Sequence, residues 1–396
     1  MWSGILKLLF YIEPCVFRNS PDLLAYWVDQ CAAIAARSAN AIHVSIVLNG
    51  AMIRRHSGAF SRIFQLSPFD LTVAFGFDRA QYAQDLVGGS GFPNAALLTS
   101  LEGIRDSLAP DVVISWSENR YLRQVFTDAR VLFMELGPLP RSGLKLAAYL
   151  DPFGHQVDSA ISRLPAFDGK NDNEQQLLDL WDGVWKAKVN RDAASSGATE
   201  WISSVGRGFE VVLLALQPDD WITYEGLDQR LDPVSLIAQT SRSYGAGFRV
   251  LPTWHSSGPP PSELMLEFLQ TECRNVIIPP PALRTATSEL FLPFVDVVAT
   301  VSSNVAVAGA IEGKLLEIFN PGKFSGLSLG RRHRRGDLLA FLVCRFCRPL
   351  EEWTGSDGAF ARHLNELLED PNRLFNPLQE YELEQINDFV IAGASG

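Results

Sequence analysis

The chain has 396 residues, more than one hydrophobic core usually holds, so we expect two domains. A formal net charge of −11 at pH 7 argues against nucleic acid as a bulk electrostatic partner. The five cysteines, an odd number, suit a reducing compartment. The lone Cys344-x-x-Cys347 pair has no second pair or nearby histidine, so we predict two buried thiols rather than zinc ligands.

The N-terminal stretch MWSGILKLLFYIEP is apolar but has no basic start and no small-residue cleavage site, so it predicts a first strand rather than a signal peptide. No run reaches the roughly 18 apolar residues of a membrane-spanning helix. We therefore expect a soluble, cytoplasmic protein, with peripheral contact at the inner membrane left open.

Strand-like and helix-like stretches alternate through the first half. A helix is predicted from Ser20-Pro21, with Ser as the N-cap and Pro in the first turn, and another near Ala95–Ser107. Such alternation predicts βαβ units and a mostly parallel sheet. The predicted strands are Ile5–Ile12, Ala41–Leu48, Phe69–Phe77, Asp111–Ser115 and Val131–Met134.

The second half repeats the alternation after a polar stretch, residues 170–197, which we interpret as the linker region. The tail, Glu351–Phe389, predicts two or three amphipathic helices. No GxGxxG or GxxxxGK[ST] motif is present, so dinucleotide and P-loop interpretations lack their phosphate-binding element. The predicted strands are Val211–Leu216, Phe248–Thr253, Asn275–Ile278, Val295–Val301 and Leu315–Phe319.

This pattern predicts an α/β protein with a GT-B-like arrangement, in which two Rossmann-like domains with mostly parallel sheets are followed by C-terminal helices. We expect an N-terminal, acceptor-side domain over residues 1–197 and a C-terminal nucleotide-sugar domain over residues 198–375. A last helix, residues 376–396, is expected to return to the first domain.

The unbroken apolar run Val211–Leu216 predicts a strand buried on both faces. Gln217, Asp219 and Asp220 follow at its carboxyl end, where ligands bind in open α/β sheets. The acids either carry chemistry or form a solvated pair that caps the next helix.

Glu135, Arg141 and Ser142 follow another apolar strand. They indicate an acid beside an anion-binding guanidinium, or a turn with an exposed ion pair. His255 follows the stretch FRVLPT directly, and such a histidine either donates to a phosphate or is structural.

Ser302, Ser303 and Asn304 lie between a strand and a small-residue helix. Their hydroxyls and the free amides of a helix N-terminus favour anion binding, and an ordinary N-cap is the alternative.

Together these motifs resemble the retaining β-Kdo transferases of bacterial capsule and O-antigen assembly, the KpsC- and WbbB-like enzymes. The resemblance spans roughly residues 130–325. It departs from the family where Ser256 replaces a proline, and where Ala308 replaces a glutamate that the nearby Glu312 would not supply. The matching residues are Glu135, Gly137, Arg141 and Ser142, then Asp151 and Gly154, then Gln217, Asp219 and Asp220, then His255, and finally Ser302 and Ser303.

The resemblance implies a glycosyltransferase that moves Kdo (3-deoxy-manno-octulosonic acid) from CMP-β-Kdo to a lipopolysaccharide O-antigen or capsule glycan, with retention. It implies Asp220, or else Asp219, as the nucleophile, and Glu135 as the group that handles the acceptor proton. His255, Ser302 and Ser303 would bind the CMP phosphate, and Arg141 would pair with the Kdo carboxylate or the phosphate. The further substrate-binding residues are Gln217, Ser142 and Asn304.

No cofactor and no metal ion are expected in the transfer step, and the partners are the CMP-Kdo donor and an oligosaccharide or lipid-linked acceptor. The chain is also compatible with a piece of a larger multi-transferase protein. Two alternatives stay open. One is a GT-B transferase that uses CMP-sialic acid or a UDP- or GDP-hexose. The other is a non-catalytic nucleotide- or glycan-binding module.

Overall fold

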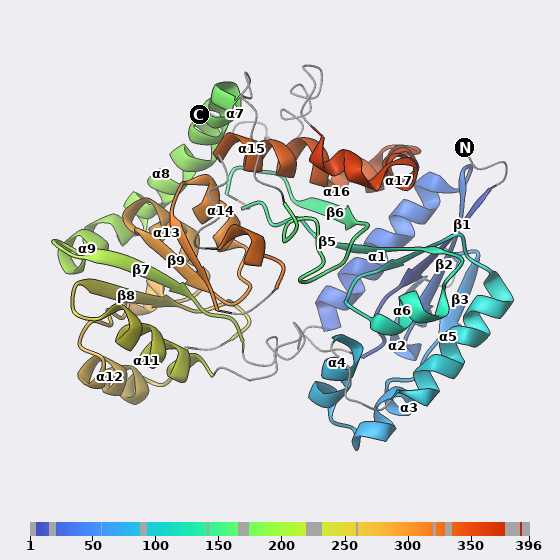
Figure 1. Ribbon diagram of the computed structural model, residues 1–396, viewed down its shortest axis with the longest axis horizontal. Helices are drawn as coiled ribbons and strands as arrows, with labels where there is room; N and C mark the ends of the chain where they lie inside the picture. Colours follow the sequence, from blue (N-terminus) through green and yellow to red (C-terminus); the bar gives the residue numbers. More distant parts are fainter. Residues whose placement is uncertain are drawn as a thin grey trace.

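The computed structural model describes residues 5–15, 21–56, 58–87, 93–140, 142–164, 174–218, 232–258, 260–319, 322–328, 335–376 and 389. Two α/β units are built around two separate sheets (Figure 1). Their connectivity confirms the predicted fold class, a GT-B-like α/β arrangement with mostly parallel strands.

Within these ranges, the first sheet has seven strands in the order β11-β6-β5-β4-β1-β2-β3. The order 3-2-1-4-5 of its parallel part is that of the doubly wound fold. The parallel strands are β1 (Leu6–Tyr11), β2 (Ile42–Leu48), β3 (Arg62–Gln65), β4 (Val112–Ser115) and β5 (Arg130–Leu136). Beyond β5, strand β6 (Ala147–Asp151) pairs antiparallel with β5, and β11 (Cys347–Pro349) pairs antiparallel with β6.

The second sheet is parallel and has the order β10-β9-β7-β8 in the described part of the chain. A parallel bridge from Val250 to Val276 adds the predicted stretch Asn275–Ile278 beside β8, as a bridge rather than a full strand. Counting this bridge, the 3-2-1-4-5 order occurs a second time. The strands are β7 (Glu210–Ala215), β8 (Phe248–Thr253), β9 (Val297–Thr300) and β10 (Leu315–Ile318).

Helices cover both faces of the first sheet. Along β1, Leu8 and Phe10 belong to one buried cluster, whereas Leu9 and Tyr11 belong to another on the opposite face. This explains why β1 is apolar without alternation. The helices of the first half are α1 (Pro21–Ser38), α2 (Gly50–His56), α3 (Pro68–Thr72), η1 (Val73–Phe75), α4 (Arg79–Val87), α5 (Ala95–Leu108) and α6 (Arg120–Val125).

The prediction of a strand over Phe69–Phe77 is wrong. That stretch forms α3 and η1, and the neighbouring strand β3 lies earlier, at Arg62–Gln65. The Ser67 hydroxyl accepts a 3.3 Å hydrogen bond from the Asp70 N–H, and Pro68 lies in the first turn. This N-cap starts a helix in spite of the apolar composition.

The described part of the expected linker, residues 174–197, is a packed helical segment. It consists of α7 (Glu174–Trp181), a π-helical turn η2 (Asp182–Lys186) and α8 (Ala187–Ser195). Trp181 and Trp185 stack with ring centroids 4.5 Å apart, and Trp185 is fully buried. The connection between the two sheets is therefore anchored in the core.

Further helices surround the second sheet and close the chain. They are α9 (Ala198–Val205), α11 (Pro233–Tyr244), α12 (Glu263–Glu272), η3 (Pro281–Leu283), α13 (Ser288–Phe291), η4 (Leu292–Phe294), α14 (Val305–Ile311), η5 (Ser325–Leu327), α15 (Arg335–Ala340), the π-helical η6 (Phe341–Phe346), α16 (Leu350–Gly355), α17 (Ala359–Glu369) and η7 (Pro371–Phe375). Helices α16, α17 and η7 agree with the amphipathic tail that the sequence predicts.

After α15 the chain returns to the first sheet, as the red end of the ribbon shows (Figure 1). Strand β11 pairs with β6, and the rings of Phe10 and Phe360 lie 6.1 Å apart. The N–H of Lys145 donates a 2.8 Å hydrogen bond to the carbonyl of Phe389. Apart from residues 376 and 389, the helix predicted over 376–396 lies outside the described residues, and the domain boundaries stay a prediction.

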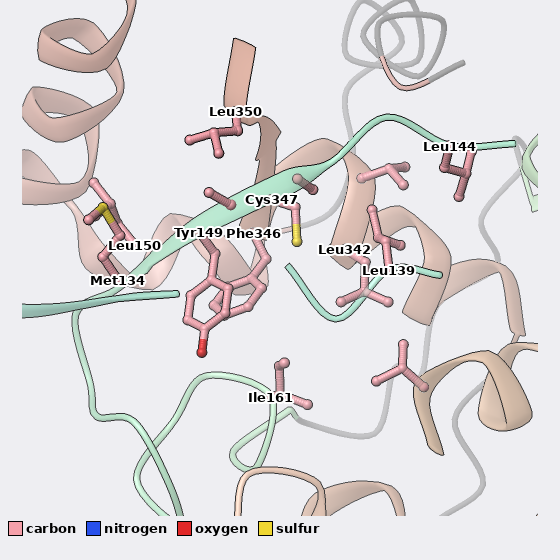
Figure 2. Close-up of a cluster of buried hydrophobic side chains, with 14 of the residues drawn as sticks. Met134, Leu139, Leu144, Tyr149, Leu150, Ile161, Leu342, Phe346, Cys347 and Leu350 are labelled. Carbon is pink, nitrogen blue, oxygen red and sulfur yellow. The ribbon is translucent and has the colours of Figure 1, made fainter. Parts of the chain in front are cut away.

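The two cysteines of the CxxC pair lie in the core beside β6. Tyr149 stacks on Phe346 at 4.4 Å, next to Cys347, as Figure 2 shows. Burial raises the pKa of Cys344 to about 11 and that of Cys347 to about 12, so both thiols are protonated. The prediction of buried free thiols is confirmed.

Candidate active site

Three predicted site residues lie side by side at the carboxyl edge of the second sheet. Thr253, Ala215 and Thr300 are register partners across the neighbouring strands β8, β7 and β9. Two positions after these partners lie, in the same order, the candidate residues His255, Gln217 and Ser302. Because the offset is equal on all three strands, these residues leave the sheet at the same level.

Hydrogen bonds fix the Ser302 side of this edge. The Ser302 hydroxyl donates to the side-chain oxygen of Gln217. The Thr300 hydroxyl donates to the Ala215 carbonyl at 2.8 Å and accepts from the Ser303 N–H at 3.1 Å. The turn that carries both serines is therefore anchored to β7.

Ser303 also has a local structural role, because its hydroxyl accepts a 3.4 Å hydrogen bond from the Val305 N–H at the start of α14. Within the described chain, the Asn304 side chain makes no cap hydrogen bond. The alternative of an ordinary cap therefore applies to Ser303, whereas the hydroxyl of Ser302 points toward Gln217.

His255 is half-buried and its ring is oriented by its own turn. The N–H of Ser257 donates to His255 Nδ1 at 3.0 Å, which leaves Nε2 as the protonated, donating nitrogen of the neutral ring. The turn packs against the residue after Gln217, since a Cβ added to Gly258 would lie 3.2 Å from Pro218 Cγ. His255 and Gln217 thus belong to one local cluster.

The predicted nucleophiles Asp219 and Asp220, and the predicted anion ligand Arg141, lie outside the described residues. Gln217 and Pro218 are the last described residues before the two acids. The roles of all three stay predictions.

In the first domain, Glu135 lies near the carboxyl end of β5 and has partners from both domains. Its Oε2 accepts a 3.1 Å hydrogen bond from the Tyr149 hydroxyl on β6 and a 2.6 Å bond from Lys323 Nζ. The Nε2 atom of His155 lies 3.6 Å from the same oxygen. Lys323 follows β10 of the second sheet, so the carboxyl ends of the two sheets meet at this ion pair.

The Asp151-x-x-Gly154 motif builds the turn that carries His155. Asp151 is fully buried, and its carboxylate accepts backbone hydrogen bonds from Phe153, Gly154 and Ala160 at 2.7–3.3 Å. Burial raises the pKa of Asp151 to about 7, although these donors favour the charged form. A Cβ on Gly154 would lie 2.5 Å from the Asp158 Cβ, so the close turn requires glycine.

The Glu118 side chain, in the loop after β4, holds the same turn. Its carboxylate accepts a 3.1 Å hydrogen bond from the His155 N–H, and burial raises the pKa of Glu118. Neither His155 nor Lys323 was singled out in the sequence, although each follows a glycine in a short loop after a strand. Their position directly after a glycine, in a loop that follows a strand, is the sequence feature that could have identified them.

A second contact between the domains involves Ser142. Its hydroxyl donates a 3.1 Å hydrogen bond to Glu289 Oε2 on α13. The adjacent Ser288 hydroxyl lies 2.8 Å from that of Thr253, at the end of β8. Ser142 therefore contacts the second domain close to strand β8, which His255 follows.

Glu312 does not supply the family glutamate that is missing at Ala308. It lies at the end of α14 and accepts a 2.8 Å hydrogen bond from Trp181 Nε1. Lys186 and Arg335 lie 3.2 Å and 3.4 Å from its carboxylate. These contacts join α14 to the helical connection.

Among the described residues, no three His, Cys, Asp or Glu side chains are grouped as metal ligands. The expectation of metal-independent transfer stays a prediction, since Asp219 and Asp220 are outside those residues. Within the same part of the chain, no helix has the length and apolarity needed to cross a bilayer.

No protein-family model and no curated protein matches the sequence. Among solved structures, the KpsC β-Kdo 2,7-transferase of Thermosulfurimonas dismutans is 10% identical over 90% of this chain and 99% of its own, with a TM-score of 0.49. The KpsC β-Kdo 2,4-transferase of the same organism is 19% identical over 65% and 87%, with a TM-score of 0.38.

A UDP-GlcNAc 2-epimerase from Neisseria meningitidis is 12% identical over 99% of this chain and 96% of its own, with a TM-score of 0.27. The KpsC β-Kdo transferases, which the motifs led us to expect, are thus among the solved structures to which the chain is similar. At these identities the similarity concerns the fold alone.

Proposed function

We propose that the protein is a glycosyltransferase that moves Kdo from CMP-β-Kdo to a glycan acceptor of lipopolysaccharide O-antigen or capsule, with retention. The observation that carries the proposal is the common level of His255, Gln217 and Ser302 at the carboxyl edge of the second sheet. This edge is where an open α/β sheet binds its ligand.

The chemistry of this edge suits a nucleotide phosphate. His255 Nε2 is a donor because Nδ1 already accepts from Ser257. The Ser302 hydroxyl is a second polar group at the same level, on the other side of Gln217. A donor such as His255 Nε2, fixed before the ligand binds, stabilises the charge that develops on the departing CMP at little reorganisation cost.

Retention would follow from two displacements. The carboxylate of Asp220, or of Asp219, attacks the anomeric carbon of Kdo while the bond to CMP breaks. The acceptor hydroxyl then attacks the same carbon, the enzyme carboxylate leaves, and Glu135 takes the hydroxyl proton. Glu135 suits this role because it lies at the contact between the two domains, whereas a core carboxylate would not reach an acceptor.

The donor class is tested by thermal unfolding with CMP, UMP, UDP and GDP. Of the four nucleotides, only CMP is expected to raise the unfolding temperature, since a ligand that binds only the folded state stabilises that state. Preference for UDP or GDP would favour a transferase with a different nucleotide sugar.

The nucleophile is tested by incubating parent, Asp219→Asn and Asp220→Asn with CMP-Kdo and acceptor, and measuring intact mass. A covalent Kdo adduct is expected in the parent and should be absent from one variant. Turnover at the parental rate in both variants contradicts the double displacement. Binding of CMP with neither hydrolysis nor transfer of CMP-Kdo by the parent indicates a non-catalytic module.

A further inference from the structure

We propose that Lys323, supplied by the second domain, is a positioning residue that holds the Glu135 carboxylate in its ionised form and in place for the acceptor proton. The inference rests on the proposed function, because it assumes that Glu135 acts on the acceptor. It adds a residue that lies in none of the motifs recognised in the sequence.

Lys323 is buried at the contact between the domains, with a side chain that is 8% exposed. Its ammonium lies 2.6 Å from Glu135 Oε2, and 4.9 Å and 5.7 Å from the ring centroids of Tyr149 and Phe324. An ammonium over aromatic faces gains a further electrostatic attraction. The side chain is therefore directed into the first domain rather than into solvent.

The backbone of this loop is fixed as well. The Lys323 carbonyl accepts a 3.5 Å hydrogen bond from the Ser159 hydroxyl of the first domain. A Cβ on Gly326 would lie 2.5 Å from the Ser162 carbonyl oxygen and 2.9 Å from that of Ile161. Since the loop packs directly on the first-domain turn, the position of the ammonium is set by the fold.

The surroundings of Glu135 favour its charged form. A buried carboxylate is costly unless it is paired and hydrogen-bonded, and an opposite charge within 4–6 Å stabilises it. The facing groups are Lys323 from the second domain, Tyr149 from β6 and His155 from the following turn. Burial, with Glu135 nearby, raises the pKa of Tyr149 well above its usual value, so its hydroxyl stays protonated and donates.

Three other titratable groups lie on the elements around this cluster. Burial raises the pKa of Asp151 on β6 to about 7, so this carboxyl group is partly protonated near neutral pH. The charge of Lys323 opposes the rise. Cys347 on β11 remains a thiol, because burial raises its pKa to about 12. Glu118, beyond His155, has a pKa raised by burial. None of these three groups supplies a positive charge, whereas the Lys323 ammonium is in direct contact with the Glu135 carboxylate.

The test is the pH profile of kcat/KM for Kdo transfer in the parent, Lys323→Met and Lys323→Arg. Removing the cation in Lys323→Met is expected to move the acidic limb of the profile to higher pH by about one unit or more. At pH values below the limb, kcat/KM should fall about tenfold. Lys323→Arg keeps the charge and should keep the limb in place. A merely structural lysine would lower the rate equally at every pH, and that result overturns the proposal.

Tyr149→Phe provides the second variant, in case Lys323→Met does not fold. It retains the ring that stacks on Phe346 and faces the ammonium, but it removes the donor to Glu135. A smaller upward shift of the same limb is expected, and an unmoved limb in a folded Tyr149→Phe variant contradicts the proposal.

Glu135→Gln distinguishes a failure of the proposed Lys323 role from a failure of the proposed function. Loss of transfer in Glu135→Gln together with an unmoved limb in Lys323→Met overturns the role of Lys323 and leaves the proposed function intact. Full transfer by Glu135→Gln overturns the role of Glu135 and, with it, that of Lys323. A parent protein that transfers no Kdo overturns the proposed function itself.

Discussion

The hydroxyl of Ser302 donates to the side-chain oxygen of Gln217, so the loops that follow β9 and β7 are joined just beyond the sheet. The two residues are 85 positions apart in the sequence, and the strand register brings them together. A hydroxyl has one proton to donate, so we expect Ser302 to turn from Gln217 to the CMP phosphate when the donor substrate binds.

Ser302→Ala should therefore weaken donor use. Hydrogen bonds to charged groups contribute about 1.5–3 kcal/mol, which corresponds to a KM for CMP-Kdo raised roughly 10- to 100-fold. Steady-state kinetics at saturating acceptor measure the change. Ser204→Ala on α9, where the exposed hydroxyl donates to the Trp201 carbonyl of its own helix, is the control. Equal KM values in the two variants would rule out the phosphate role of Ser302.

Glu312 is expected to stabilise the fold rather than the reaction. Its carboxylate is 6% exposed and faces Trp181, Lys186 and Arg335. Glu312→Ala leaves the Nε1 donor of the buried Trp181 without this partner, whereas Lys186 and Arg335 are partly exposed and also lie near Asp182. A loss of about 1–3 kcal/mol in the free energy of unfolding is expected. The measurement is urea-induced unfolding.

The matched control is Glu263→Ala. Glu263 is 71% exposed and pairs with Arg284, so its removal should cost less than about 1 kcal/mol. Similar costs for the two variants would show that the buried pairing of Glu312 adds nothing.

Glu13 gives the fold a pH dependence with a defined sign. Burial raises the pKa of this carboxyl group to about 7, although Tyr11, Tyr82 and the Cys15 N–H donate to it. Between its unfolded value near 4.5 and about 7, the folded state binds more protons than the unfolded state. The free energy of unfolding therefore falls as pH rises through this window, by up to about 3 kcal/mol.

Glu13→Gln should remove this part of the pH dependence. Chemical unfolding of parent and variant at pH 5 and pH 8 measures it: the difference in stability between the two pH values should be smaller in the variant. An unchanged difference would mean that Glu13 titrates in the folded state as it does in the unfolded state.

The sequence predicted the strands that end at the candidate site, because long apolar runs with polar residues at their carboxyl ends have few other interpretations. Strand β8 was predicted with its observed bounds, Phe248–Thr253. The apolar content of Phe69–Phe77 predicted a strand, but the N-cap formed by Ser67 starts a helix there instead. It also missed β6, which is short and pairs antiparallel with β5.

Within the candidate site, the sequence indicated which residues end strands but not which of them meet. The pairing of Glu135 with Lys323 joins residues 188 positions apart and depends on how the two domains pack. Asp151, Gly154 and Gly137 were matched to motifs without an assigned role, and in the structure all three shape tight backbone packing. A matched motif therefore identifies the place, and only the contacts separate binding residues from supporting ones.

The last prediction concerns Gly137, two residues after Glu135. Its N–H donates a 2.7 Å hydrogen bond to the Ala147 carbonyl, and an added Cβ would lie 2.8 Å from Ala147 Cβ and 3.0 Å from Cys347 Sγ. Gly137→Ala should therefore cost about 1–3 kcal/mol in unfolding free energy, because β5 would be pushed away from β6 and β11.

Gly183→Ala is the matched control, since an added Cβ there meets nothing within 4 Å and alanine favours the helix. Ala147→Gly combined with Gly137→Ala removes the nearest clash and should recover part of the loss. If the double variant is less stable than Gly137→Ala alone, the cost comes from backbone conformation rather than from crowding. In that case the close approach of β5 to β6 is not the reason for glycine at this position.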